Sequence, residues 1–186
     1  AYRLIAGVEI YGGFQGYETN LSDRDPSTYV VVLSGDLGQD DSSGGSTDEN
    51  AYHVVIADNL FGVSPLVDGV TISSGNSEDD GGGLFIRNYD AASTAFPILK
   101  QCNIVNNNAK WGGAVNVESG GVNLLLCKII MNNATVNGAA LFNRGDMVID
   151  NCLISANVAT GLGGALYSSG NVVRIINCTI AQNNAY

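Results

Sequence analysis

Acidic side chains offer the most obvious chemistry in this sequence. Six of them fall in two polar tracts rich in glycine and serine: Asp36, Asp40, Asp41, Glu78, Asp79 and Asp80. Clustered carboxylates on flexible loops supply the oxygen ligands that a hard cation such as Ca²⁺ prefers. Their spacing matches neither a twelve-residue EF-hand loop nor an RTX nonapeptide repeat. The six residues are therefore our candidate Ca²⁺ ligands, and the sequence indicates no other cofactor.

Carboxylate pairs could also serve a glycoside hydrolase, which needs two acids across the sugar, one with a raised pKa. The pairs Asp40-Asp41 and Asp48-Glu49 and the run at 78–80 all lie in turn-rich loops, where solvated carboxylates are the ordinary case. The single histidine, His53, has no Ser or Cys partner nearby in sequence, so we interpret it as a structural strand residue. A polysaccharide lyase would want a basic groove, but Lys and Arg are scattered. We assign no catalytic residue.

All four cysteines recur at nearly constant spacing. Steps of 25, 25 and 26 residues separate Cys102, Cys127, Cys152 and Cys178, and Val70 holds the same position 32 residues before the first. Fixed periods of this length are typical of solenoids. Side chains one turn apart on a parallel stack point the same way, which disfavours disulfide geometry. We expect four buried free thiols that act as small apolar residues.

Each repeat contains three β-forming segments. The first alternates inward and outward residues, as in Cys102–Val105, and the second follows a Gly-Gly-Ala turn such as Gly112–Ala114. The third is an apolar run before the next cysteine, such as Val122–Leu126. We predict an all-β fold, a single parallel β-helix with about 25 residues and three short strands per turn.

Asparagines close the first segment of successive repeats at Asn107, Asn132, Asn157 and Asn183. Asn tolerates the left-handed conformation that tight turns need, and identical amides one turn apart can hydrogen-bond along the axis. The pattern predicts an asparagine ladder at this corner, with the left-handed turn on the ladder residues.

The chain reads as one β-helix domain over residues 1–186, with irregular rungs and long loops at 1–66 and regular repeats at 67–186. Strands are predicted at 4–11, 29–33 and 52–56, with 66–72 leading into the repeats. An insertion at Ile86–Ala95 lengthens the first repeat, and insertions of this kind often bind ligands. The last residues stop within a rung, so we expect the β-helix to continue beyond residue 186.

Composition and charge exclude some classes of binding partner. The formal charge is −10, with 8 Lys and Arg against 18 Asp and Glu, which argues against nucleic acid and anionic membranes. The longest apolar runs are too short to span a membrane. Tracts of Asn, Gly, Ser and Thr suit an extracellular protein, and Trp111 with the eight tyrosines could supply a sugar-stacking strip.

Two sets of residues resemble a known family. The phrase from Ile104 through Asn107 and Ala109 to Gly112–Val115 is similar to the polymorphic outer membrane protein repeats of bacterial right-handed β-helix surface proteins. The N-terminal segments 8–19, 24–25, 33–36, 52–55 and 68–72 look like the head of the same secreted proteins. Ile replaces the usual Phe before x-x-N, and Gly138–Ala140 lacks one glycine. The resemblance spans nearly the whole chain and implies a right-handed, pectate-lyase-like β-helix at a cell surface, without shared catalytic residues.

The leading functional hypothesis is a non-catalytic, extracellular structural or adhesin-like segment. The expected partner is either a second copy, joined through the open β-helix ends into a filament, or a neighbouring segment of a longer chain. One alternative is a polysaccharide lyase or glycoside hydrolase acting near the insertion at 86–95. Another is a glycan-binding module that uses exposed Tyr and Trp.

Overall fold

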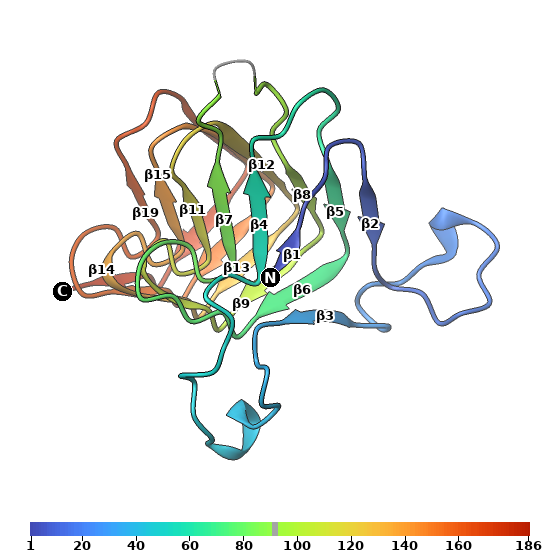
Figure 1. Ribbon diagram of the computed structural model, residues 1–186, viewed down its shortest axis with the longest axis horizontal. Helices are drawn as coiled ribbons and strands as arrows, with labels where there is room; N and C mark the ends of the chain where they lie inside the picture. Colours follow the sequence, from blue (N-terminus) through green and yellow to red (C-terminus); the bar gives the residue numbers. More distant parts are fainter. Residues whose placement is uncertain (91–92) are drawn as a thin grey trace.

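The computed structural model describes residues 1–90 and 93–186 as a stack of parallel strands. Six successive turns, or rungs, each contribute one strand to each of three long sheets (Figure 1). Sheet A consists of β1 (Tyr2–Arg3), β4 (Val55–Asp58), β7 (Leu84–Arg87), β11 (Val115–Val117), β15 (Leu141–Asn143) and β19 (Leu166–Ser168). The predicted all-β parallel β-helix is confirmed.

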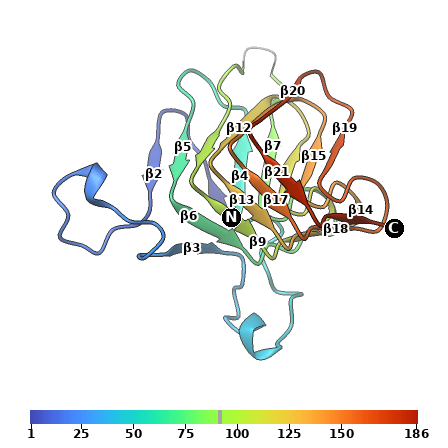
Figure 2. The ribbon, with the colours of Figure 1, turned by 180° about the vertical axis from the view of Figure 1, so that it is seen from behind.

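Sheets B and C complete the three long faces. Sheet B consists of β2 (Glu9–Tyr11), β5 (Leu66–Asp68), β8 (Ile98–Lys100), β12 (Gly121–Leu125), β16 (Asp146–Asp150) and β20 (Val173–Ile176). Sheet C consists of β3 (Val31–Ser34), β6 (Val70–Ser73), β9 (Asn103–Val105), β13 (Lys128–Ile130), β17 (Leu153–Ser155) and β21 (Thr179–Ala181). Figure 2 shows β9, β13, β17 and β21 side by side, as the parallel pairing requires.

A fourth, shorter sheet was not predicted. Sheet D lies at the corner between sheets C and A of the later rungs and consists of β10 (Asn108–Trp111), β14 (Asn133–Asn137), β18 (Val158–Ala159) and β22 (Asn184–Ala185). These strands are short and polar, so their sequence reads as a turn. Their pairing comes from the stacking of whole rungs rather than from local β propensity.

The core is a set of inward columns in register. Ile104 pairs with Ile72 on one side and Ile129 on the other, and all three side chains are fully buried. One contiguous cluster of apolar side chains runs from Leu4 in the first rung to Ile154 in the fifth. Each residue of the column covers its copy in the next rung, so the register predicted from the cysteine spacing holds from Val70 onward.

The corners differ from expectation in one respect. The left-handed residues precede the ladder asparagines by one position: Asn106 has φ 56°, Met131 has φ 55° and Ala156 has φ 57°. The mixed side chains show that the corner does not require asparagine for its backbone conformation. The ladder asparagine is therefore selected for its amide rather than for tolerance of positive φ.

The first rung carries the two longest excursions. Residues 12–30, with the 3₁₀ turn η1 (Leu21–Asp23), join β2 to β3, and residues 35–54, with η2 (Asp41–Ser43), join β3 to β4. Both project from the body in Figure 1. The strand predicted at 4–11 is interrupted, because Gly7 adopts φ 75° in the turn between β1 and β2.

Candidate functional site

Loop 35–54 gathers four carboxylates into one place. One oxygen each from Asp36, Asp40, Asp41 and Glu49 lies within 4.8 Å of the others, and we call these four residues the acidic cage. Three of them were predicted metal ligands, whereas Glu49 was considered only as part of an acidic pair. The loop hangs below β3 in Figure 1.

Local turn chemistry holds the cage in shape. The backbone amide of Asp40 donates to Asp36 Oδ1 at 3.2 Å, and Ser43 Oγ donates to the carbonyl of Asp40 at 2.8 Å. Gly44 ends η2 with φ 78°, a conformation that glycine adopts without strain. Asn50 closes the far side, where its Nδ2 donates to Asp41 Oδ2 at 2.9 Å.

The other predicted metal ligands lie elsewhere. Glu78, Asp79 and Asp80 line a groove of about 570 Å³ on the outer side of sheet A, so the six-residue set does not form a single site. Tyr52 and His53 enter this groove from the end of loop 35–54. Arg87 and Tyr89 enter it from the segment predicted as an insertion, whose residues 91 and 92 lie outside the described residues. We call this the sheet A groove.

His53 is held by the wall of the sheet A groove. Its ring stacks on Phe85 with centroids 4.8 Å apart and planes 16° apart. Its Nδ1 lies 2.8 Å from the carbonyl oxygen of Gly81, and a carbonyl only accepts, so Nδ1 carries the proton. Burial lowers the pKa of His53 and favours the neutral ring. This geometry agrees with the structural role predicted for it.

Asp80 is a carboxylate of the groove whose titration is altered by its surroundings. Burial, followed by the charge of Glu118, raises the pKa of Asp80 above its usual value. Its Oδ1 accepts a hydrogen bond of 2.7 Å from Asn116 Nδ2. Glu118 in turn accepts from Tyr89 Oη at 2.8 Å. Two acids with different environments therefore face one groove, an arrangement the sequence could not reveal because 38 positions separate them.

Aromatic rings flank these acids. The side chains of Tyr52 and Tyr89 are 60% and 65% exposed. Arg87 lies over the rings of Phe85 and Tyr89, with its Cζ 5.6 Å and 5.9 Å from their centroids. Its Nη2 also pairs with Asp58 Oδ2 at 3.2 Å, so its charge is shared with a carboxylate outside the groove. The groove combines apolar faces with a surplus of negative charge.

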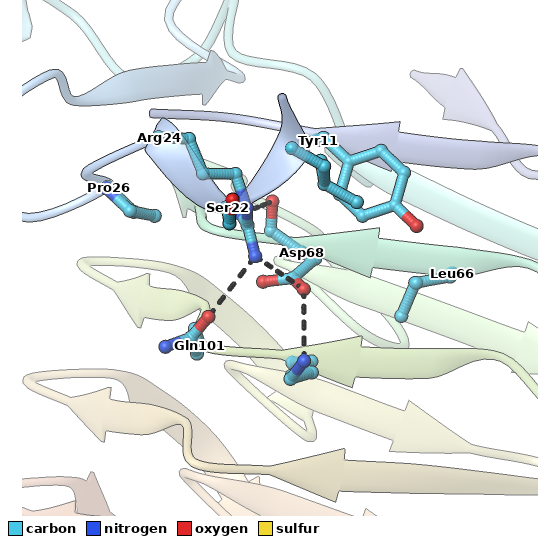
Figure 3. Close-up of a pocket in the computed structure, with 9 residues that line it drawn as sticks. Tyr11, Ser22, Arg24, Pro26, Leu66, Asp68 and Gln101 are labelled. Atoms are coloured by element: carbon cyan, nitrogen blue, oxygen red, sulfur yellow. Dashed lines mark hydrogen bonds and ion pairs between the residues drawn. The ribbon is translucent and has the colours of Figure 1, made fainter. Parts of the chain in front are cut away.

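A second pocket of about 570 Å³, beside sheet B, has a structural explanation. Figure 3 shows Arg24 reaching from loop 12–30 to Asp68 and Gln101. Arg24 Nη2 lies 2.6 Å from Asp68 Oδ2, and both side chains are at least nine-tenths buried. Lys100 adds a second cation at 3.5 Å. Through these contacts Arg24 connects the loop to two rungs. The charges of Arg24 and Asp68 neutralise each other, so we assign this pocket no ligand.

The comparisons with known proteins agree with this architecture. A family model described as the right handed beta helix region matches residues 45–186, more than half of the chain. The chain belongs to the right-handed β-helix family. Searches of curated proteins and of solved structures find no match. The family assignment establishes the fold of this β-helix and names no activity, so its function is argued from the geometry of its sites.

The ladders of the β-helix lie apart from both candidate sites. Asn132 Nδ2 donates to Asn157 Oδ1 at 3.0 Å, and Asn107 Nδ2 donates to Asn132 Oδ1 at 3.1 Å. Asn183 continues the series by accepting from Asn157 Nδ2 at 2.8 Å. The buried amides therefore form the asparagine ladder that the sequence pattern indicated.

The four cysteines stand in one column as free thiols, three of them buried: Cys102, Cys127, Cys152 and, partly buried, Cys178. The amide of Cys127 donates to the sulfur of Cys152 at 3.3 Å. Hydrogen bonding to the neighbouring thiols of Cys102 and Cys152, followed by burial, raises the pKa of Cys127 well above its usual value. The thiols of the column pack as part of the apolar core or against it.

Among the helices formed by residues 1–90 and 93–186, none has the length and apolar character needed to traverse a lipid bilayer.

Proposed function

We propose that this β-helix is a non-catalytic, adhesin-like segment of an extracellular protein and that it binds a glycan in the sheet A groove. The carrying observation is that two exposed tyrosines, Tyr52 and Tyr89, line the same hollow as four carboxylates. Aromatic faces bury the C–H surface of a sugar ring, while carboxylates accept hydrogen bonds from its hydroxyl groups. This combination of aromatic surface and a few polar groups is typical of concave ligand sites.

The charge of the groove narrows the ligand to neutral or amino sugars. Four acids line it, and its single cation, Arg87, is paired with Asp58. A uronic acid polymer would be repelled by these carboxylates. The same argument disfavours the lyase alternative, since lyases of this kind act on acidic sugars through cationic groups.

The extracellular location rests on the sequence resemblance to bacterial surface proteins and on the composition. The family assignment is compatible with both. End-to-end assembly into a filament stays a prediction, and sedimentation of the native full-length protein is its test.

A glycan array with the wild-type chain and the double variant Tyr52→Ala/Tyr89→Ala tests the proposal. We expect wild-type binding to neutral or amino glycans and a loss of affinity of about tenfold or more in the double variant. Tyr17→Ala is the matched control, because Tyr17 is 74% exposed on loop 12–30, outside the groove. Equal binding by the double variant, or binding limited to acidic glycans, contradicts the proposal.

One observation favours glycoside hydrolysis as a second candidate. The raised pKa of Asp80 suits the general acid of a hydrolase, and Glu118, which lines the same groove, supplies the second carboxylate that such an enzyme needs. Release of reducing sugar from glycans that bind the array decides between the two. Turnover by the wild-type chain that Asp80→Asn abolishes establishes the hydrolase, whereas binding without turnover supports the non-catalytic proposal.

A further inference from the structure

The acidic cage in loop 35–54 has the donors of a metal site, and we propose that it binds one Ca²⁺ ion. The ligands would be carboxylate oxygens of Asp36, Asp40, Asp41 and Glu49, and Asn50 is hydrogen-bonded to the cage at Asp41. This site is separate from the sheet A groove, so the proposal does not depend on glycan binding.

The separation of the oxygens suits a single central ion. Calcium binds oxygen at about 2.3–2.6 Å, so two ligands on opposite sides of one ion lie at most about 5.2 Å apart. The four carboxylates each place one oxygen within 4.8 Å of the others. The four oxygens are therefore close enough together to share one ion.

Unpartnered oxygens give independent support. Asp40 Oδ1, Asp41 Oδ1 and Glu49 Oε1 are enclosed and have no hydrogen-bond partner. Asn50 is only 8% exposed, and its Oδ1 also lacks a partner, while its Nδ2 contacts the cage at Asp41. Buried oxygens without donors are rare in folded proteins, because each loses its hydration without compensation. A bound cation would satisfy all of them together.

Among the described residues, no Lys or Arg pairs with the carboxylates of the acidic cage. The sequence contains no Lys or Arg between Arg24 and Arg87. Within the part of the chain that the structure describes, the ion pairs of Lys and Arg go to Asp58 and Asp68 and not to the cage. The buried carboxylate of Asp68 does have a cation of the chain beside it, since Arg24 Nη2 lies 2.6 Å from Asp68 Oδ2, although Asp68 Oδ1 also lacks a hydrogen-bond partner.

Two glycines let the backbone close around the cage. A Cβ on Gly38 would lie 2.9 Å from Glu49 Oε1, and a Cβ on Gly45 would collide with the carboxylate of Asp40. The close approach leaves the oxygens enclosed rather than spread into solvent. An all-oxygen, carboxylate-rich cage favours Ca²⁺ over Mg²⁺, which keeps several of its waters and demands a stricter geometry.

Calorimetry on the chelator-treated chain tests the site. We expect one equivalent of Ca²⁺ to bind, at least about tenfold more tightly than Mg²⁺. The variant Asp40→Asn/Asp41→Asn should lose at least about tenfold in affinity. The matched control Glu78→Gln/Asp79→Asn removes the same charge from two exposed residues of the sheet A groove, outside the cage, and should bind Ca²⁺ as the wild type does.

Limited proteolysis gives the second readout. At a free Ca²⁺ concentration of about 100 times the Kd, cleavage within residues 38–50 should slow by up to about a hundredfold, because the metal-free population falls in that proportion. Glu49→Gln, which leaves η2 intact, repeats the test if the double variant does not fold. The proposal is overturned if no heat is detected and cleavage is unchanged, if Mg²⁺ binds equally well, or if the control variant is the one that loses binding.

Discussion

Asn132 in the rungs and Asn50 in loop 35–54 are both buried asparagines, and their amides meet opposite surroundings. Asn132 donates to Asn157 and to the carbonyls of Ile104 and Ile130, and its own oxygen accepts from Asn107. Asn50 Oδ1 has no partner, and neither do nearby oxygens of the acidic cage. In the rungs each ladder asparagine is satisfied by its copies one turn away. The loop has no copies, and these oxygens of Asn50 and the cage find no partner among the described residues.

A cavity in the stacked core of the rungs should cause the largest loss of stability. Ile129→Ala removes a fully buried side chain from the isoleucine column and should destabilise the protein by about 2–5 kcal/mol. Its neighbour Ile130 lies on the outer face of β13 and is only partly buried, so Ile130→Ala is the matched control with a smaller loss. Denaturant unfolding followed by circular dichroism measures both. Equal losses would show that the column is not the source of stability.

The ladder gives the next largest effect. Asn132→Ala leaves buried groups on two neighbouring rungs without partners and should cost about 3 kcal/mol. Asn133→Ala changes an exposed residue whose side-chain amide donates to Asn108 Oδ1, and should cost about 1 kcal/mol or less. The same unfolding experiment compares them, and a ladder variant as stable as its neighbour would remove the distinction between rungs and loops.

The Arg24 anchor tests how the chain neutralises a buried acid by itself. Arg24→Ala leaves Asp68 with Lys100 at 3.5 Å as its remaining cation, and should cost about 2 kcal/mol. Arg3→Ala breaks a pair in which Arg3 is 61% exposed, and should cost less than about 1 kcal/mol. Thermal melting of the two variants is the measurement. A greater loss for Arg3 than for Arg24 would contradict the anchoring role.

The smallest effect on stability is expected for Asp80 in the sheet A groove, and it depends on pH. Burial raises the pKa of Asp80, so its contribution to stability is present below about pH 4 and is lost as the pH rises through the folded-state pKa. Asp80→Asn keeps an acceptor for Asn116 and removes that loss. The variant should melt slightly above the wild type at pH 7 and together with it at pH 3. A variant that melts lower at pH 7 would mean that the ionised carboxylate is stabilising.

The sequence predicted the parts of the molecule that repeat. The positions of Cys102 and Ile104 recur with the period of the rungs, so the strand register, the thiol column and the asparagine ladder follow from spacing alone. The contacts made by the loops do not recur with the period of the rungs. Glu49 joins Asp36, and Glu118 joins Asp80, through turns that carry no repeated signal, and the six predicted Ca²⁺ ligands were therefore divided between two places. The fourth sheet was missed for a related reason, since its short polar strands gain their pairing from the stack.

Hydrogen exchange with and without Ca²⁺ tests the central claim, that the rungs are a self-satisfied scaffold and the interruptions take up ligands. Amides of β6, β9, β13 and β17 should exchange slowly in chelator and equally slowly in CaCl₂. Amides between residues 38 and 50 should exchange rapidly in chelator and become protected in CaCl₂. Protection that is unchanged in the loop, or that rises equally in the rungs, would contradict the account.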